Sequence, residues 1–354
     1  MSKDKFYHCD WLLKQLDCNG NPPIIFIVCS KVRGPGKTYS FTQLLMKKLV
    51  DNGQKFILLC RLKDNLGYVA EGIFKAVLRQ EYPNMIMYEQ KVGHLYSNVF
   101  VDVKKGKEKE TIHAGYVIPL NSASGIKQVS GMFTDADAIF FDEFQPMSKK
   151  EYVADEVTKF KTIWESVARG NGQTCRYLPV YMCSNTIDRY NPYFVALGLV
   201  SKLQDNTRLF RGNGFVYQQA TNENAVKAHK EHGIAAILST GHNDDYADDS
   251  TWSNDCKAAI CKPDGWGRPT YFTTICYDDH EYGVKYYSDV GIYYIDRTPD
   301  KKHPFRFCLT LDGEKNLPLL KTSAIAKILR DAIEGGCVRY KDNGCRNMAM
   351  EMII

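Results

Sequence analysis

Short apolar runs and helical patterns alternate along the first 220 residues of the chain. The apolar runs occupy residues 23–29, 55–60, 138–141 and 178–183. Runs of this kind, with no polar alternate position, are typical of strands buried on both faces of a parallel sheet. The amphipathic patterns predict helices over residues 38–50, 66–80 and 155–168. This alternation predicts a doubly wound α/β domain.

Residues 85–119 follow another pattern. Apolar and polar residues alternate on both sides of a highly charged stretch at residues 104–110. Alternation with a period of two is the pattern of a strand with one exposed face. The stretch therefore predicts an antiparallel hairpin inserted into the α/β domain.

The pattern changes again after residue 220. Residues 221–236 are polar with a helical period, and the acidic stretch at 244–249 indicates a solvated connector. Strands rich in β-branched and aromatic residues are predicted at 270–276, 282–287, 291–295 and 306–311, and a helix at 321–335. This set suits a small ribonuclease-H-like α/β domain. We therefore predict a first domain at 1–220, a linker or lid at 221–255 and a C-terminal domain at 256–354.

A glycine-rich turn connects the first predicted strand to the first predicted helix. Its residues 31–38 read KVRGPGKT, and strand, glycine loop and helix are the setting of a P-loop. Gly34, Pro35 and Gly36 would let main-chain N–H groups approach phosphate, Lys37 adds a charge, and the Thr38 hydroxyl can bind Mg²⁺. The usual motif has glycine where this chain has Lys31, so we expect Ser30 or Lys31 to take an unusual backbone conformation.

Polar residues also follow two other apolar runs. Asp142 and Glu143 end the third run, where Asp142 is placed to hold Mg²⁺ and Glu143 to polarise an attacking water. Ser184 and Asn185 end the fourth run, at a position where related ATPases sense the γ-phosphate; a simple turn is the alternative. Together with the P-loop, these residues predict hydrolysis of a nucleoside triphosphate with Mg²⁺.

Composition and charge limit the classes of partner that the chain is expected to bind. The chain has 354 residues and a net charge of +5, and residues 1–220 hold 29 basic and 21 acidic side chains. Such an excess suits a nucleic-acid partner, although it also describes an ordinary solvated face. No apolar run approaches the ~20 residues that cross a bilayer, so no membrane partner is expected. The 12 cysteines form no C-x-x-C pair, which favours reduced cytosolic thiols over zinc ligands.

Four stretches in order carry a family resemblance: residues 32–38, Ile118-Pro119-Leu120 with Lys127, residues 141–144, and residues 184–186 leading into 191–194. The chain resembles the DNA-packaging (encapsidation) ATPases of protein-primed tailed phages of the phi-twenty-nine type, which are relatives of large terminases. The resemblance implies a P-loop ATPase domain of the additional-strand, catalytic-glutamate class and a degenerate ribonuclease-H-like domain.

The resemblance also implies a function and partners. The family forms homomeric rings, with five subunits, at the portal of an empty capsid in the host cytoplasm, and drives double-stranded DNA inward by hydrolysing ATP. Contacts with DNA should fall on its backbone, because every sequence must pass. The protein is not expected in the mature virion, and the sequence leaves open whether a packaging RNA takes part.

Several basic residues then gain candidate roles. Arg169 matches the family's trans-acting arginine, which would stabilise the phosphoryl group bound by the neighbouring subunit. Lys127 matches a second basic residue of the interface, and Arg33 would lie near the γ-phosphate. A solvated cation is the alternative for each. Further candidates for the nucleotide or for DNA are Arg61, Lys63, Lys149 and Lys150.

The C-terminal domain leaves a second hypothesis. Asp278, Asp296 and Asp312 lie at or near predicted strand ends, where a terminase-like nuclease would gather carboxylates around metal ions. A metal-dependent nuclease or another nucleic-acid-processing P-loop protein is therefore the alternative to a packaging motor. A binding module that uses its nucleotide as a switch is a third hypothesis, although a switch would not need Glu143.

Overall fold

The computed structural model describes residues 6–31, 34–106, 108–147, 151–169, 174–189, 191–200, 202–203, 207–220, 259–277, 280–309 and 317–352. The chain divides into two compact units, residues 1–254 and 255–354. The linker proposed at 221–255, with its helical and acidic stretches, lies outside the described residues.

The first unit is built on a nine-stranded sheet with the order β3-β4-β5-β2-β6-β7-β1-β9-β8. The six strands from β5 to β9 in this order pair in parallel, and the hairpin strands at both edges pair antiparallel. The strands are β1 (Ile25–Ser30), β2 (Lys55–Cys60), β3 (Met85–Val92), β4 (Tyr96–Lys105), β5 (Glu108–Pro119), β6 (Ala136–Asp142), β7 (Val180–Asn185), β8 (Leu209–Gly212) and β9 (Phe215–Ala220).

The order of the central strands confirms the expected class of P-loop fold. Strand β7 lies between β1, which leads into the glycine loop, and β6, which ends in the acidic pair. It is the additional strand that gives the class its name. Its register aligns Asn185 with Ser30 and Cys183 with Asp142. The carboxyl ends of all three strands therefore meet at one edge of the sheet, where open α/β sheets bind ligands.

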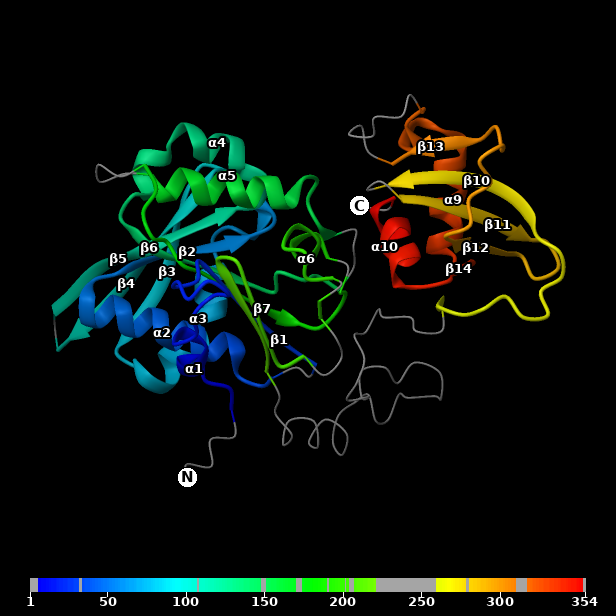
Figure 1. Ribbon diagram of the computed structural model, residues 1–354. Helices are drawn as coiled ribbons and strands as arrows, with labels where there is room; N and C mark the ends of the chain where they lie inside the picture. Colours follow the sequence, from blue (N-terminus) through cyan, green and yellow to red (C-terminus); the bar gives the residue numbers. More distant parts are fainter. Residues whose placement is uncertain are drawn as a thin grey trace, which may run out of the picture. The chain divides into compact units, whose positions relative to one another are not determined.

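Helices cover both faces of this sheet (Figure 1). Alternate strand residues supply two separate cores, because successive side chains of a strand point to opposite faces. One core joins the sheet to α4 and α5, and the other joins it to α1, α2 and α3. The helices of this unit are α1 (Asp10–Leu13), α2 (Lys37–Asn52), α3 (Val69–Glu81), α4 (Ala123–Gln128), α5 (Glu156–Ala168) and α6 (Pro192–Ala196), with 3₁₀ turns at η1 (Lys63–Asn65), η2 (Leu120–Ser122) and η3 (Ser130–Phe133).

The inserted hairpin is present and larger than expected. Strands β4 and β5 form the hairpin around the charged turn, and β3 adds a further antiparallel strand at the edge. Strand β5 also pairs in parallel with β2, so the insertion continues the main sheet.

The second unit has a five-stranded sheet of its own, with the order β13-β10-β11-β12-β14. Strands β10, β11 and β12 form the expected antiparallel meander, and β13 joins β10 in parallel. Strand β14 and helix α10 were not predicted. The elements are β10 (Thr270–Tyr277), β11 (His280–Tyr287), β12 (Ile292–Asp296), β13 (Arg306–Cys308), η7 (Leu320–Thr322), α9 (Ala324–Glu334), β14 (Val338–Tyr340) and α10 (Asn343–Glu351).

Sheet and helices of the second unit share one core, which includes Ile275, Val284, Leu329 and Met348. This arrangement agrees with the expected small α/β domain. Throughout the part of the chain that the structure describes, every helix is too short or too polar to cross a bilayer.

Candidate functional site

The glycine loop lies between β1 and α2, as the sequence predicts. Gly34 and Gly36 adopt φ values of 79° and 100°, and Gly36 is the N-cap of α2. The expectation that Ser30 or Lys31 would take an unusual conformation is wrong, because neither has a positive φ. The glycines supply that conformation, at no steric cost. Arg33 lies outside the described residues, and Pro35 is buried, its carbonyl accepting a hydrogen bond from the Tyr7 N–H at 2.7 Å.

Lys37 projects from the first turn of α2 toward the ends of β1 and β7. Its ammonium group donates to the Ser30 hydroxyl and, at 3.2 Å, to the Asn185 side-chain oxygen. Burial lowers the pKa of Lys37, and the acidic groups that face it, including Asp142, oppose this shift. A γ-phosphate near this ammonium would therefore meet a poorly solvated positive charge, whose field is stronger than it would be in water.

The two residues proposed to bind Mg²⁺ contact each other, although 104 positions separate them. The Thr38 hydroxyl donates to Oδ1 of Asp142 at 3.1 Å. The same oxygen accepts from the Cys183 thiol at 2.9 Å and from the Glu143 N–H at 3.0 Å. Burial raises the pKa of Asp142, and these hydrogen bonds oppose the shift.

This donor set fits Mg²⁺. The ion is usually bound by one or two carboxylates together with water and substrate phosphates, so one hydroxyl and one carboxylate at the end of a phosphate loop are sufficient protein ligands. A cation beside Asp142 would also favour the charged form of a carboxylate that burial disfavours.

Glu143 has an unusual backbone conformation. Its φ is 51°, and among the described residues only Asp155 shares a positive φ without being glycine. This conformation follows directly after β6 and turns the chain out of the sheet. The Glu143 side chain is exposed at the same edge as Lys37 and Thr38, where it is available to a water molecule.

Ser184 and Asn185 have different surroundings. Asn185 contacts Lys37 and lies in the site, whereas the buried Ser184 hydroxyl donates to the Asn185 carbonyl at 2.8 Å and lies 3.7 Å from the Cys29 sulfur. The structure thus brings Asn185 to the loop and directs Ser184 toward its own strand and β1.

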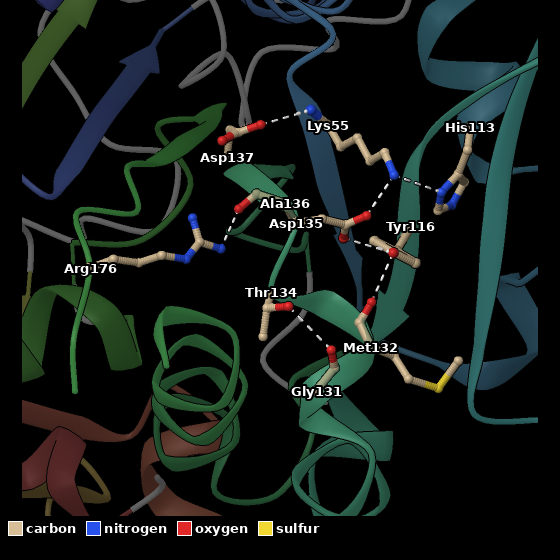
Figure 2. A network of polar contacts seen from close by, with 10 residues as sticks. All are labelled: Lys55, His113, Tyr116, Gly131, Met132, Thr134, Asp135, Ala136, Asp137 and Arg176. Atoms are coloured by element: carbon tan, nitrogen blue, oxygen red, sulfur yellow. Dashed lines mark hydrogen bonds and ion pairs between the residues drawn. The ribbon is translucent and has the colours of Figure 1, made fainter. Parts of the chain in front are cut away.

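Arg169 lies at the other end of the sheet. It is the C-cap of α5, and the preceding residue, Ala168, accepts a hydrogen bond from the Arg176 N–H at 2.9 Å. The Arg176 guanidinium in turn donates to the carbonyl of Ala136, the first residue of β6, as Figure 2 shows. Asp142 ends the same strand, and six residues of strand span about 20 Å. Arg169 is therefore about one strand length from the site of its own chain.

Lys127 is exposed on α4, which packs on α5. With the other described residues, the side chains of Lys127 and Arg169 form no hydrogen bond or ion pair. Lys149 and Lys150 lie outside the described residues, and Lys63 lies in η1, three residues beyond the end of β2.

Of the three proposed nuclease carboxylates, only Asp296 lies among the described residues. Asp278 and Asp312 lie outside them, and Asp296 forms an ion pair with Lys285 at 2.6 Å and accepts hydrogen bonds from Thr298. Among the described residues, no group of three metal-binding side chains lies together.

Two residues of the site escaped the sequence analysis. Ser30 binds the Lys37 ammonium, and the Cys183 thiol binds Asp142. Both lie on buried strands where apolar neighbours conceal a polar role. The signal that finds them is strand register, because each is aligned with a site residue of the adjacent strand.

A phosphate loop at the end of a parallel strand, an added strand beside it and an acidic pair on the next strand define a P-loop NTPase. The comparison with known families agrees with this class. The chain belongs to the family of Podovirus DNA encapsidation proteins (Gp16), whose family model matches residues 1–354.

The chain is also similar to individual relatives in sequence and to solved structures in fold. The DNA packaging protein of Bacillus phage phi29 is 23% identical over 325 residues, which are 90% of each chain. That of Bacillus phage B103 is 29% identical over 183 residues, 51% of this chain and 50% of the relative. The fold is similar to a chain of the bacteriophage Phi-29 genome packaging motor assembly (TM-score 0.56, 20% identity, 99% of both chains) and of the Phi-28 gp11 DNA packaging motor (TM-score 0.54, 16% identity, 96% of this chain and 94% of that one).

Proposed function

We propose that this DNA encapsidation protein is the ATP-driven motor that moves double-stranded DNA through the portal into a preformed procapsid. The observation that carries the proposal is the contact between Thr38 and Asp142 beside the Lys37 ammonium. It supports the proposal because a P-loop ATPase would need residues of these types, for phosphate and for metal, at one edge of the sheet.

In this proposal, the main chain of residues 34–36 and Lys37 hold the phosphates of ATP, and Thr38 and Asp142 hold Mg²⁺. The ion would neutralise charge on the phosphate oxygens and orient them. Glu143 orients the attacking water and accepts its proton, while Asn185 contacts the terminal phosphate. Binding of ATP displaces the present hydrogen bonds of Lys37 to Ser30 and Asn185.

We further propose that catalysis requires a neighbouring subunit. Arg169 lies about one strand length, roughly 20 Å, from its own Asp142, which is too far for contact with its own nucleotide. In a homomeric ring, which we propose to have five members, Arg169 would reach the nucleotide of the next subunit, with Lys127 on the same interface. An arginine supplied in this way contributes about 10³- to 10⁵-fold in rate.

The test is packaging itself. Purified chain, portal-bearing procapsids, linear DNA, ATP and Mg²⁺ should yield DNA protected from added nuclease, and Lys37→Ala should abolish protection. A rate of ATP hydrolysis that does not change when DNA and procapsids are added would contradict the proposed motor. Cleavage of a plasmid by the purified chain with Mn²⁺ would instead favour the nuclease.

A further inference from the structure

Arg61 directly follows β2 and reaches across to the turn that carries Glu143. Its guanidinium donates to the Glu143 carbonyl at 2.9 Å and to the Phe144 carbonyl. The rings of Phe141 and Tyr152 each lie 5.2 Å from the guanidinium carbon. The charge is therefore held against the turn of the acidic pair, between two aromatic rings.

Glu156, the first residue of α5, fixes the other side of the guanidinium. Its Oε2 lies 3.2 Å from Arg61 Nε and also accepts the Val153 N–H, and its Oε1 accepts the Tyr193 hydroxyl. The side chains of Arg61 and Glu156 are 13% and 1% exposed. A pair this buried, whose guanidinium and carboxylate each make further hydrogen bonds, holds one geometry.

The backbone that Arg61 holds is the strained one. A residue with a Cβ in the left-handed region costs about 1–2 kcal/mol relative to its usual conformations, so Glu143 keeps its φ of 51° only if its surroundings impose it. Two carbonyls bound by one planar guanidinium fix both peptide groups beyond the Glu143 Cα. Those peptide groups set the direction in which the Glu143 side chain leaves the chain.

We propose that Arg61 is a positioning residue for catalysis: its guanidinium, anchored by Glu156, holds the main chain at Glu143 so that the carboxylate faces the attacking water. This inference rests on the proposed function, in which Glu143 acts on that water. In this role Arg61 acts through the main chain of Glu143 and Phe144, to whose carbonyls it donates. A displacement of about 1 Å in a catalytic group lowers turnover by up to about 10²-fold, whereas nucleotide binding depends on Lys37 and the loop.

The experiment measures kcat for ATP hydrolysis and the affinity for a fluorescent ATP analogue with the full-length chain. Arg61→Lys keeps a positive charge near Glu156 but cannot hold both carbonyls in one plane. We expect kcat to fall about 10- to 100-fold and analogue affinity to stay within about twofold. Glu156→Gln removes the anchor and should lower kcat with the same unchanged affinity. Arg306→Lys, the same exchange at the Arg306–Glu281 pair of the second unit, is the matched control and should leave kcat unchanged.

A double substitution separates positioning from general stability. If Arg61 acts through Glu143, Arg61→Lys should cost little further turnover once Glu143→Gln is present. An equal further loss in that background, a parallel loss of analogue affinity in both Arg61→Lys and Glu156→Gln, or an unchanged kcat in Arg61→Lys would each overturn the inference. If Glu143→Gln alone leaves turnover intact, the proposed role of Glu143 fails first, and this result is distinguishable because it does not involve Arg61.

Discussion

Lys37 has its charge near the buried ends of two strands, where water solvates it poorly. The Ser30 hydroxyl and the Asn185 amide oxygen take the place of water, and Asp142 lies nearby. An ammonium group held in this way is already desolvated before a phosphate arrives. The free-energy cost of removing water from the ammonium group is thus met during folding. A triphosphate that binds there would not have to meet this cost again.

Replacement of Lys37 should lower the affinity for nucleotide itself. We expect Lys37→Ala to weaken nucleotide affinity by at least about tenfold, because a charge-assisted hydrogen bond to phosphate contributes roughly 1.5–3 kcal/mol. Equilibrium titration with a fluorescent ATP analogue measures the change. Lys47→Ala, on the same helix α2 but farther from the loop, is the control. Equal affinities in wild type and Lys37→Ala would place the phosphates elsewhere.

Glu143 should show the opposite behaviour. Glu143→Gln retains the shape of the side chain but loses the base, so nucleotide should bind normally while turnover falls by about 10²- to 10⁴-fold. Single-turnover hydrolysis of labelled ATP, together with analogue titration, separates the two effects. If this variant hydrolysed ATP at the wild-type rate, a residue other than Glu143 would activate the attacking water.

The sequence predicted those candidate site residues that the structure brings together at strand ends, and it missed those whose contacts depend on pairing between strands. Thr38, Asp142 and Asn185 were found because each ends an apolar run or follows the glycine loop. Cys183 was missed because its role comes from the register of β7 against β6. Arg61 was found as a candidate for nucleotide or DNA, but only the structure reveals that it binds the main chain of Glu143.

Among the elements, the buried parallel strands β1, β2, β6 and β7 were predicted well, since both of their faces contact a core and the apolar run is continuous. The parallel strand β9 was not predicted. Strand β3 was not separated from the hairpin because it is an edge strand, whose mixed burial gives a weak pattern. Strand β14 has only three residues. The strand order was not derivable from local patterns, because it depends on contacts between segments that are distant in sequence.

A polar cluster ties the amino-terminal ends of β2 and β6 to the inserted strand β5. Lys55 contacts Asp135 at 2.5 Å and the Nδ1 atom of His113 at 3.2 Å, as Figure 2 shows. Burial, and then the positive charge of Lys55, lower the pKa of His113. The folded chain therefore binds a proton at His113 less readily than the unfolded chain does.

This shift predicts a pH dependence of stability. Below about pH 6.5 the unfolded chain protonates His113 while the folded chain resists, so the free energy of unfolding should decrease by at most about 1.4 kcal/mol per pH unit from this residue. Urea unfolding at pH 7.5 and pH 5.5 measures the decrease. It should be smaller in His113→Asn and unchanged in His94→Asn, whose side chain is exposed. An identical decrease in wild type and His113→Asn would rule out this contribution.

For the whole molecule, the separation of Arg169 from its own Asp142 makes subunit mixing informative. Arg169→Ala and Glu143→Gln subunits should each hydrolyse ATP poorly. Mixed, they should partly recover activity, because an intact arginine of one subunit can meet an intact glutamate of another. Recovery should be greatest near equal proportions in an ATPase titration. No recovery at any ratio would indicate that the arginine acts within its own chain.

The helix that ends at Arg169 begins at Glu156, and its 13 residues span about 20 Å. In the proposed ring, Arg169 at one end of the helix would contact the triphosphate of the neighbouring subunit. Glu156 at the other end binds Arg61, which holds the turn at Glu143 in the same chain. In such a ring, the surface that supplies the arginine differs from the surface that receives it, so copies would join head to tail and the ring would have a direction of rotation. A single subunit that lacked both Glu143 and Arg169 would then stop ATP hydrolysis at two nucleotide sites, its own and that of the adjoining subunit.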